Sequence, residues 1–182
     1  VDRALLALQG PKAVEVLSRL APTVASMQFM DIAHVTLNGI SCIVSRSGYT
    51  GEDGYEISVA ADQAEVLAEA LLDYEEVEWI GLGARDSLRL ECGLCLYGHD
   101  LDSTTTPVEA SLLWAISQVR RSDGARAGGF LGAAVILEQI ESKNVARKRV
   151  GLVGQTKAPV REGTEIFDGS GKKIGTVTSG TA

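Results

Sequence analysis

The sequence predicts an α+β fold, with a ferredoxin-like antiparallel sheet and helices followed by the beginning of an all-β domain. One observation is the order of apolar patterns in the first half, which runs strand, helix, three strands and helix. Another is the dipeptide Asn38-Gly39 between two β-branched stretches, the strongest short signal for a hairpin. A third is a change of composition near Asn144, after which strand-like stretches alternate with turn residues. We therefore expect two parts, residues 1–142 and residues 143–182.

The first strand and the first helix are expected within residues 4–22. The apolar run Ala4–Leu8 predicts the strand. Gly10 and Pro11 then mark the start of the helix, because proline is favoured at the first helical position. Apolar residues follow at helical spacing, at Val14, Leu17 and Leu20. Pro22 ends this helix.

Three strands are expected next. The stretches Ile32–Leu37 and Ile40–Val44 are rich in β-branched residues and are expected to pair through Asn38-Gly39. Another strand is expected at Tyr55–Val59. The residues before it, SRSGYTGEDG, favour a turn or loop.

Helices are expected after these strands. Asp62 and Glu65 resemble a capping box, and the amphipathic helix that they start carries Val66, Leu67, Ala70 and Leu71. Further helices are expected at Ala84–Cys95 and at about Glu109–Val119. The segment 120–148 is expected to be a loop, flexible over RRSDGARAGG.

The last part is expected to contain strands only. The stretches with strand character are Arg149–Val153, Glu165–Phe167 and Ile174–Thr178. DGSGKK is the predicted turn between the last two of them. We interpret this part as the start of an all-β domain.

Composition excludes several classes of protein. The chain has 182 residues, of which 45% are hydrophobic and 23% charged, as in a globular protein. No apolar run approaches the ~20 residues of a membrane span, so no membrane partner is expected. The formal net charge of −7 argues against nucleic-acid binding, which usually needs a concentrated basic face.

The cysteines and histidines do not form a recognisable metal site. Cys42, Cys92 and Cys95 are an odd number of cysteines, which favours a reducing compartment over a disulfide framework. Zinc needs four ligands, and neither His34 nor His99 lies at a standard spacing from the cysteine pair. We therefore expect no metal, and expect Cys92 and Cys95 to pack in the core as part of an apolar helix.

The first candidate binding segment is RSGYTGEDGYE, residues 46–56. Its small residues allow a loop to wrap closely around a ligand, and Tyr49 and Tyr55 offer flat faces for stacking. The carboxylate of Glu56 can accept two parallel hydrogen bonds from an N–H/NH₂ edge, such as a pterin or guanine carries. On composition alone, a hairpin loop with solvated acids is the more common explanation.

The second candidate is the pair Arg85 and Arg89, four residues apart on one helix face. Two guanidinium groups there are suited to a carboxylate tail. The alternative is that they pair with acids of the same segment, such as Asp86 or Glu91.

Six stretches together resemble the glycine cleavage T-protein family of tetrahydrofolate-dependent aminomethyltransferases. They are LLALQGP, SRSGYTGEDGYEISV, GARDSLRLECGLCLYG, TTPVEASLLW, KRVGL and GTVTSG. They occur in the order and spacing of the family and cover most of the chain. The resemblance implies a protein of three domains and about twice this length, of which this chain matches the middle and the start of the C-terminal barrel.

The resemblance also implies site residues. The glutamate that holds the pterin edge matches Glu56, and folate-binding arginines match Arg85 and Arg149. Tyr49 is implied as a lining residue, whereas Arg89 is expected to be structural. The family's catalytic aspartate is expected before the first residue of this sequence, and a folate-contacting tyrosine after Ala182. No catalytic residue is therefore assigned in this chain, and residues 1–182 alone are expected to be inactive.

The implied reaction moves a methylene group from the aminomethyl-dihydrolipoyl arm of a lipoyl carrier (H) protein to tetrahydrofolate, with release of ammonia. The lipoyl group belongs to that partner, and tetrahydrofolate is the acceptor. The implied location is the cytoplasm of a bacterium or the mitochondrial matrix of a eukaryote.

Two other functions stay open at this point. One is the folate-binding domain of a dehydrogenase that demethylates sarcosine or dimethylglycine, which would need a flavin domain upstream. The other is a non-enzymatic folate-binding protein of iron–sulfur assembly. That branch carries K-G-C-Y-x-G-Q-E, whereas the nearest stretch here is GLCLYGHD, without Lys-Gly before a cysteine and without Gln-Glu.

Overall fold

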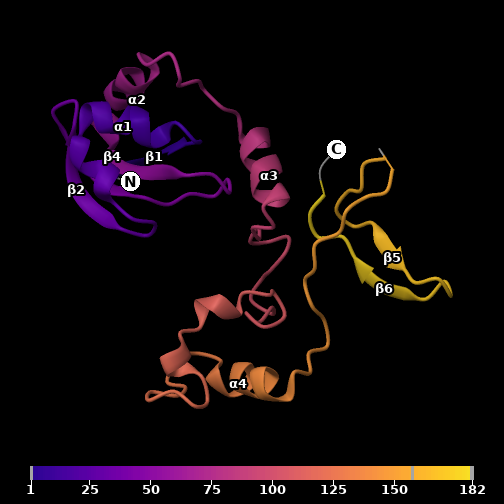
Figure 1. Ribbon diagram of the computed structural model, residues 1–182. Coiled ribbons are helices and arrows are strands. Elements are labelled where there is room, and N and C mark those ends of the chain that lie inside the picture. Colours follow the sequence, from indigo (N-terminus) through magenta and orange to yellow (C-terminus); the bar gives the residue numbers. More distant parts are fainter. Residues whose placement is uncertain (1, 157, 181–182) are drawn as a thin grey trace. The chain divides into compact units, whose positions relative to one another are not determined.

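The structure is a computed structural model and describes residues 2–156 and 158–180. The chain divides into two compact units, Val1–Cys92 and Gly93–Ala182 (Figure 1). Each unit is described by itself. Among the described residues, no helix is both long enough and apolar enough to cross a membrane.

The first unit is built on a four-stranded antiparallel sheet (Figure 1). Its strands are β1 (Arg3–Gln9), β2 (Ile32–Leu37), β3 (Ile40–Ser45) and β4 (Gly54–Ala60). They lie in the order β1-β4-β3-β2. The first and the last of these strands along the chain, β1 and β4, are therefore paired with each other. Asn38 and Gly39 adopt φ values of 47° and 77°, as a type I′ hairpin turn requires, and join β2 to β3. The predicted hairpin is thus confirmed.

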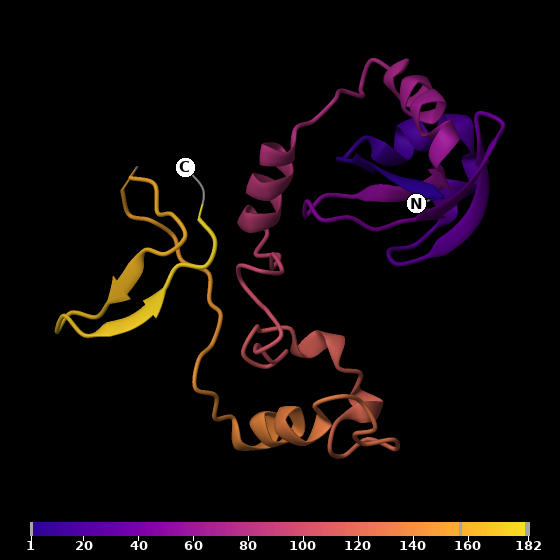
Figure 2. The ribbon, with the colours of Figure 1, turned by 180° about the vertical axis from the view of Figure 1, so that it is seen from behind.

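Two helices, α1 (Ala13–Leu20) and α2 (Ala64–Leu72), cover one face of this sheet, as Figures 1 and 2 show. Alternate residues of β4 point to them, so Tyr55, Ile57 and Val59 are fully buried. Leu17 and Leu67 complete this core from the two helices. The short 3-10 helices η1 (Pro22–Ser26) and η2 (Ala61–Gln63) connect the layers.

The element order of this unit is β-α-β-β-β-α, as the pattern predicts. A ferredoxin-like order places the second helix before the last strand, whereas here α2 follows all four strands. The α+β class with an antiparallel sheet is therefore confirmed, and the connection of the last strand differs. The third helix, α3 (Leu82–Glu91), stops before Cys92 instead of reaching Cys95. Cys92 is exposed and Cys95 is only half-buried, so the expectation that this pair packs in the core is wrong: the helix that was to carry both ends before them.

The second unit departs further from the sequence expectations. A helix over Glu109–Val119 is wrong: this stretch holds only the short 3-10 helices η3 (Leu113–Ala115) and η4 (Gln118–Arg120). Ser111 adopts φ 60°, a left-handed conformation that no α-helix continues through.

The segment expected to be a loop contains α4 (Ala133–Ser142), so that expectation is wrong as well. Gly132 and Lys143 flank this helix with φ values of 76° and 53°. One buried side chain, Ile136, faces inward from it.

The end of the described chain carries the two-stranded sheet of β5 (Glu165–Phe167) and β6 (Lys173–Thr176). These antiparallel strands confirm the predicted hairpin, although β6 ends at Thr176 and not at Thr178. The expected strand Arg149–Val153 does not form, so that expectation is wrong: Arg149 donates its backbone N–H to the carbonyl of Glu109, which lies in no strand. The barrel itself stays a prediction.

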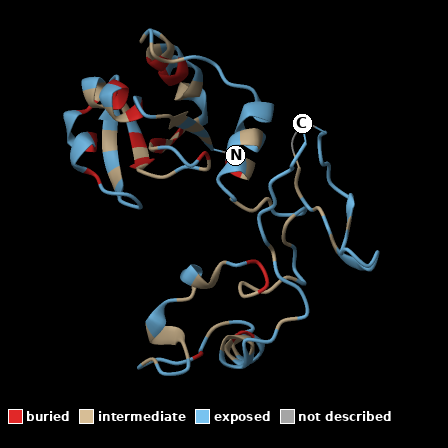
Figure 3. Ribbon diagram, turned by 45° about the vertical axis from the view of Figure 1, so that its right-hand side comes forward, coloured by how far each residue is buried: buried red, intermediate tan, exposed pale blue. Residues whose placement is uncertain are grey.

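Figure 3 shows that the buried positions gather in the sheet and helices of the first unit. Among the described residues of the second unit, the buried hydrophobic side chains are Ala110 and Ile136, and the buried charged residue is Glu109.

Candidate functional site

The loop between β3 and β4, residues 46–53, is closed at its base by an ion pair. The guanidinium of Arg46 donates from Nε and Nη2 to the two carboxylate oxygens of Asp53, at 3.0 and 2.6 Å. Arg46 also donates to the carbonyl of Met27 and lies 5.6 Å from the ring centroid of Tyr55. The hydrogen bonds from Arg46 lower the pKa of Asp53. The two ends of the loop are therefore fixed to each other and to the body of the first unit.

The interior of this loop is filled by the side chain of Gln9, at the end of β1. Its Nε2 donates to the carbonyls of Ser47 and Tyr55, at 3.1 and 3.2 Å. Its Oε1 accepts a hydrogen bond from the buried hydroxyl of Thr50, at 3.3 Å. One amide thus links both flanks of the loop and its tip.

The glycines of the loop make room for this amide. A Cβ atom at Gly48 would lie 1.9 Å from Oε1 of Gln9, and one at Gly54 would lie 2.5 Å from Cδ of Gln9. Both distances are shorter than any real contact, so only glycine fits at these two positions while Gln9 keeps its place.

Glu56 lies in β4 on the face of the sheet opposite α1 and α2, and it is half-buried. Its cross-strand neighbours are Ala7 on β1 and Ser45 on β3, both small. One carboxylate oxygen, Oε2, accepts a hydrogen bond of 2.7 Å from the hydroxyl of Ser47. This predicted site residue therefore sits beside the loop as a fixed carboxylate with small neighbours.

Tyr49 and Arg85, two of the predicted binding residues, are brought together. The guanidinium carbon of Arg85 lies 4.8 Å from the ring centroid of Tyr49, within the range of a cation–π contact. Cys92, next to the end of α3, donates from Sγ to the carbonyl of Thr50 at 3.4 Å. The tip of the loop therefore contacts both ends of α3.

Arg89 takes a different role from Arg85. It is 3% exposed, and its Nε donates to Asp86 at 2.8 Å. The pairing with an acid of the same helix is thus the observed arrangement, and Arg89 is structural. Arg85 is exposed, with its guanidinium over a ring.

Arg149, the remaining predicted binding residue, belongs to the second unit. Its guanidinium donates to the carbonyls of Ala110 and Gly93, at 2.9 and 2.8 Å. Its backbone N–H donates to the carbonyl of Glu109 at 2.7 Å. The guanidinium of Arg149 therefore donates to backbone carbonyls of this unit, and the carbonyl of Arg149 accepts a hydrogen bond of 2.9 Å from the hydroxyl of Ser111.

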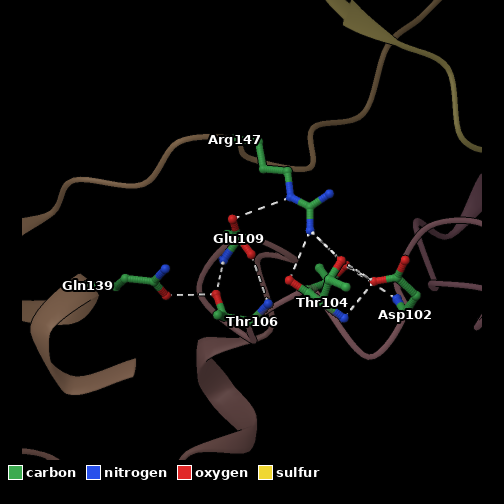
Figure 4. Close-up of polar contacts among 7 residues, drawn as sticks. Asp102, Thr104, Thr106, Glu109, Gln139 and Arg147 are labelled. Carbon is green, nitrogen blue, oxygen red and sulfur yellow. Dashed lines mark hydrogen bonds and ion pairs between the residues drawn. The ribbon is translucent and has the colours of Figure 1, made fainter. Parts of the chain in front are cut away.

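A polar cluster next to Arg149, drawn in Figure 4, was not anticipated from the sequence. Thr106 and Glu109 form a reciprocal capping box: each backbone N–H donates to the side chain of the other, at 2.9 and 3.2 Å. Arg147 donates to Glu109 at 3.3 Å and to the carbonyl of Thr104 at 3.1 Å (Figure 4). The T-P-V-E stretch at residues 106–109 has the capping-box spacing and was the signal for this cluster.

Hydrogen bonds set the ionisation of the two acids in this cluster. Asp102 Oδ1 accepts from the backbone and hydroxyl of Thr104, which lowers the pKa of Asp102. The pKa of Glu109 is lowered first by the N–H of Thr106 and then by Arg147. Both groups are therefore carboxylates at neutral pH. Among the described residues, no group of three or more His, Cys, Asp or Glu side chains is placed to hold a metal ion.

Comparison with known proteins places this chain in a protein family. The model of the GCVT N-terminal domain matches residues 1–120, about two thirds of the chain. The chain belongs to the glycine cleavage T-protein family. The matched range includes the loop, Glu56 and Arg85, and it ends before Arg149.

Individual members of the T-protein family are similar over nearly the whole chain. Mitochondrial aminomethyltransferases from Canis lupus familiaris and Solanum tuberosum are 53% and 51% identical to it. The alignments cover 99% and 98% of this chain but only 44% and 43% of those proteins. The crystal structure of the glycine cleavage system aminomethyltransferase T from Bartonella henselae has a TM-score of 0.87 and is 46% identical. It covers 98% of this chain, which spans 47% of that one.

Proposed function

We propose that the complete gene product is the tetrahydrofolate-dependent aminomethyltransferase of a glycine cleavage system. The observation that carries this proposal is the identity of about half of all residues, over 98–99% of the chain, with aminomethyltransferases. The chain spans less than half the length of these relatives, so the activity, substrates and partners are proposed for the whole protein.

Glu56 fits the pterin edge of tetrahydrofolate by its chemistry. It is a half-buried carboxylate, and small side chains flank it across both neighbouring strands. Ser47 occupies one oxygen with a hydrogen bond, which holds the carboxylate in one orientation. A fixed carboxylate is the acceptor that a ligand with parallel N–H and NH₂ donors requires.

Arg85 and Tyr49 fit the more polar end of the same ligand. An exposed guanidinium stacked on a ring presents its N–H groups at the ring edge, where a carboxylate tail can accept them. We assign Arg149 to folate binding on the resemblance alone. Such a role would have to share a guanidinium that already donates to two backbone carbonyls.

In the proposed reaction, two folate nitrogens bond to the methylene carbon, and its bonds to the lipoyl sulfur and to the amine nitrogen break. The two folate N–H protons account for the new S–H group and for ammonia, so the reaction needs no oxidant. The residues of this chain bind and orient the acceptor, which is the larger part of such catalysis. The catalytic aspartate is expected outside these 182 residues.

The remaining assignments follow the same proposal. The donor partner is a lipoyl carrier (H) protein, and the compartment is the bacterial cytoplasm or the mitochondrial matrix. Residues 1–142 are proposed as part of the folate-binding core and residues 143–182 as the beginning of the C-terminal barrel.

A turnover assay tests the function. The complete gene product is mixed with aminomethylated lipoyl carrier protein, and ammonia is measured with and without tetrahydrofolate. We expect ammonia release that depends on tetrahydrofolate. Residues 1–182, purified alone, are expected to release none, because they span less than half the length of the relatives. Release from the complete protein that is independent of folate would contradict the proposal.

A further inference from the structure

Three side chains form a directed hydrogen-bond chain that ends on Glu56. The hydroxyl of Ser47 donates to Oε2 of Glu56 at 2.7 Å and lies 2.9 Å from the hydroxyl of Ser45. A hydroxyl can donate only one hydrogen bond, and Ser47 donates its own to Glu56. Ser47 must therefore accept a hydrogen bond from the hydroxyl of Ser45. The chain therefore runs from Ser45 through Ser47 to Glu56.

Gln9 fixes this chain from inside the loop. Its amide donates to the carbonyl of Ser47 and to that of Tyr55, the residue directly before Glu56. One side chain from β1 therefore restrains the backbone at the donor and at the acceptor of the Ser47–Glu56 hydrogen bond. The residues lie 38 and 46 positions from Gln9 in the sequence, so only the folded sheet brings them together.

We infer that Ser47 and Gln9 are positioning residues for the ligand-binding carboxylate of Glu56. Ser47 binds one lone pair of Oε2 and so orients the carboxylate, whose Oε1 and second Oε2 lone pair stay available to the ligand, while Gln9 keeps Ser47 in place. This inference rests on the proposed function, in which Glu56 accepts hydrogen bonds from the pterin edge. Neither Ser47 nor Gln9 is assigned a contact to the ligand.

The physical reason is that a two-point acceptor depends on orientation. A glutamate side chain has three rotatable bonds and loses rotamer freedom when it is fixed. If Ser47 already fixes the Glu56 side chain in the free protein, this entropy loss does not reduce the binding free energy. Removal of the hydroxyl should therefore weaken binding without removing any ligand contact.

The test is calorimetric titration of tetrahydrofolate into the complete gene product and its variants. Ser47→Ala should weaken binding about three- to tenfold, the effect of one lost hydrogen bond. Ser47→Thr keeps a hydroxyl and should bind as the wild type does. The matched control is Ser58→Ala, because Ser58 lies on the same face two residues beyond Glu56 and its hydroxyl accepts from Arg3. It should leave the affinity unchanged.

A double-mutant cycle separates positioning from a general loss of structure. In a Glu56→Ala background, Ser47→Ala should have no further effect on tetrahydrofolate affinity, because the group that it positions is gone. Gln9→Met keeps the length but removes the amide, and it should follow the same pattern. It provides a second route if Ser47→Ala fails to fold.

The outcomes distinguish this inference from the function beneath it. If Glu56→Ala weakens binding but Ser47→Ala and Gln9→Met do not, the positioning role is wrong and the pterin assignment stands. Additive effects in the double variants also overturn the positioning role. If Glu56→Ala binds tetrahydrofolate like the wild type, the pterin assignment itself is wrong.

Discussion

The two units of this chain are ordered by different means. In the first unit, a sheet and two helices enclose an apolar core in which Leu17, Tyr55 and Ile57 are fully buried. In the second, the segment from Asp102 to Arg149 is held by a capping box and by arginines that donate to backbone carbonyls. A layered core tolerates the loss of one polar contact, whereas a hydrogen-bonded segment depends on each of them.

The largest effect is expected in the core of the first unit. Leu17→Ala should lower the free energy of unfolding by about 2–5 kcal/mol, because it leaves a cavity at a fully buried position. Urea unfolding of the complete gene product, followed with a spectroscopic probe placed within residues 1–92, measures the change in the free energy of unfolding. Leu5→Ala is the matched control, since Leu5 is 62% exposed, and should change it by less than about 0.5 kcal/mol. Equal effects of the two variants would contradict this description of the core.

A smaller but more local effect is expected in the second unit. Glu109→Ala removes half of the capping box and the acceptor of Arg147, and should destabilise this segment by about 1–2 kcal/mol. Hydrogen exchange should become faster at the amides of Thr106 and Ala110, while the amides of β4 stay protected. Glu138→Ala, at an exposed position of α4, is the control and should change neither. If β4 loosens together with Thr106, the two units are not ordered independently.

The smallest effect is expected from acid. The pKa values of Asp102 and Glu109 are lowered in the folded chain, so both carboxylates stabilise it above their unfolded pKa values of about 4. This stabilisation is lost as the pH falls through the lowered values. Protection factors corrected for intrinsic exchange should therefore fall below pH 4 at Thr104 and Thr106 before they fall at Ile57. If protection is lost at Ile57 first, the carboxylates of Asp102 and Glu109 do not hold the segment around Thr104 and Thr106 in place.

The difference between the two units also explains why the secondary structure of the first could be predicted from the sequence more fully than that of the second. The strands of the first unit were predicted almost to the residue, because alternation along β4 and the Asn38-Gly39 turn are local patterns. In the second unit, a capping box at Thr106 starts one turn, and the left-handed Ser111 stops it, so the expected helix does not continue. No local sequence pattern predicts the left-handed conformation of Ser111.

The candidate site divides in the same way. The carboxylate of Glu56 and the pairing of Arg89 with Asp86 could be proposed from residue type and spacing, whereas the contact of Arg85 with Tyr49 could not. The role of Gln9 could not, because each of its hydrogen bonds joins residues about 40 positions apart. The backbone partner of Arg149 could not be predicted either, because the carbonyl of Glu109 lies 40 positions away in the sequence.

The close fit of Gln9 between two glycines also constrains how this loop can change over evolutionary time. Gly48→Ala alone places a methyl group 1.9 Å from Oε1 of Gln9, so the Gln9 side chain must move and give up its hydrogen bonds to the loop. A shorter side chain at position 9 removes the obstacle but leaves the carbonyls of Ser47 and Tyr55 without their donor. Positions 9 and 48 therefore form an epistatic pair, in which neither single step is neutral. In a combinatorial library, alanine at position 48 should therefore be enriched together with a small residue at position 9.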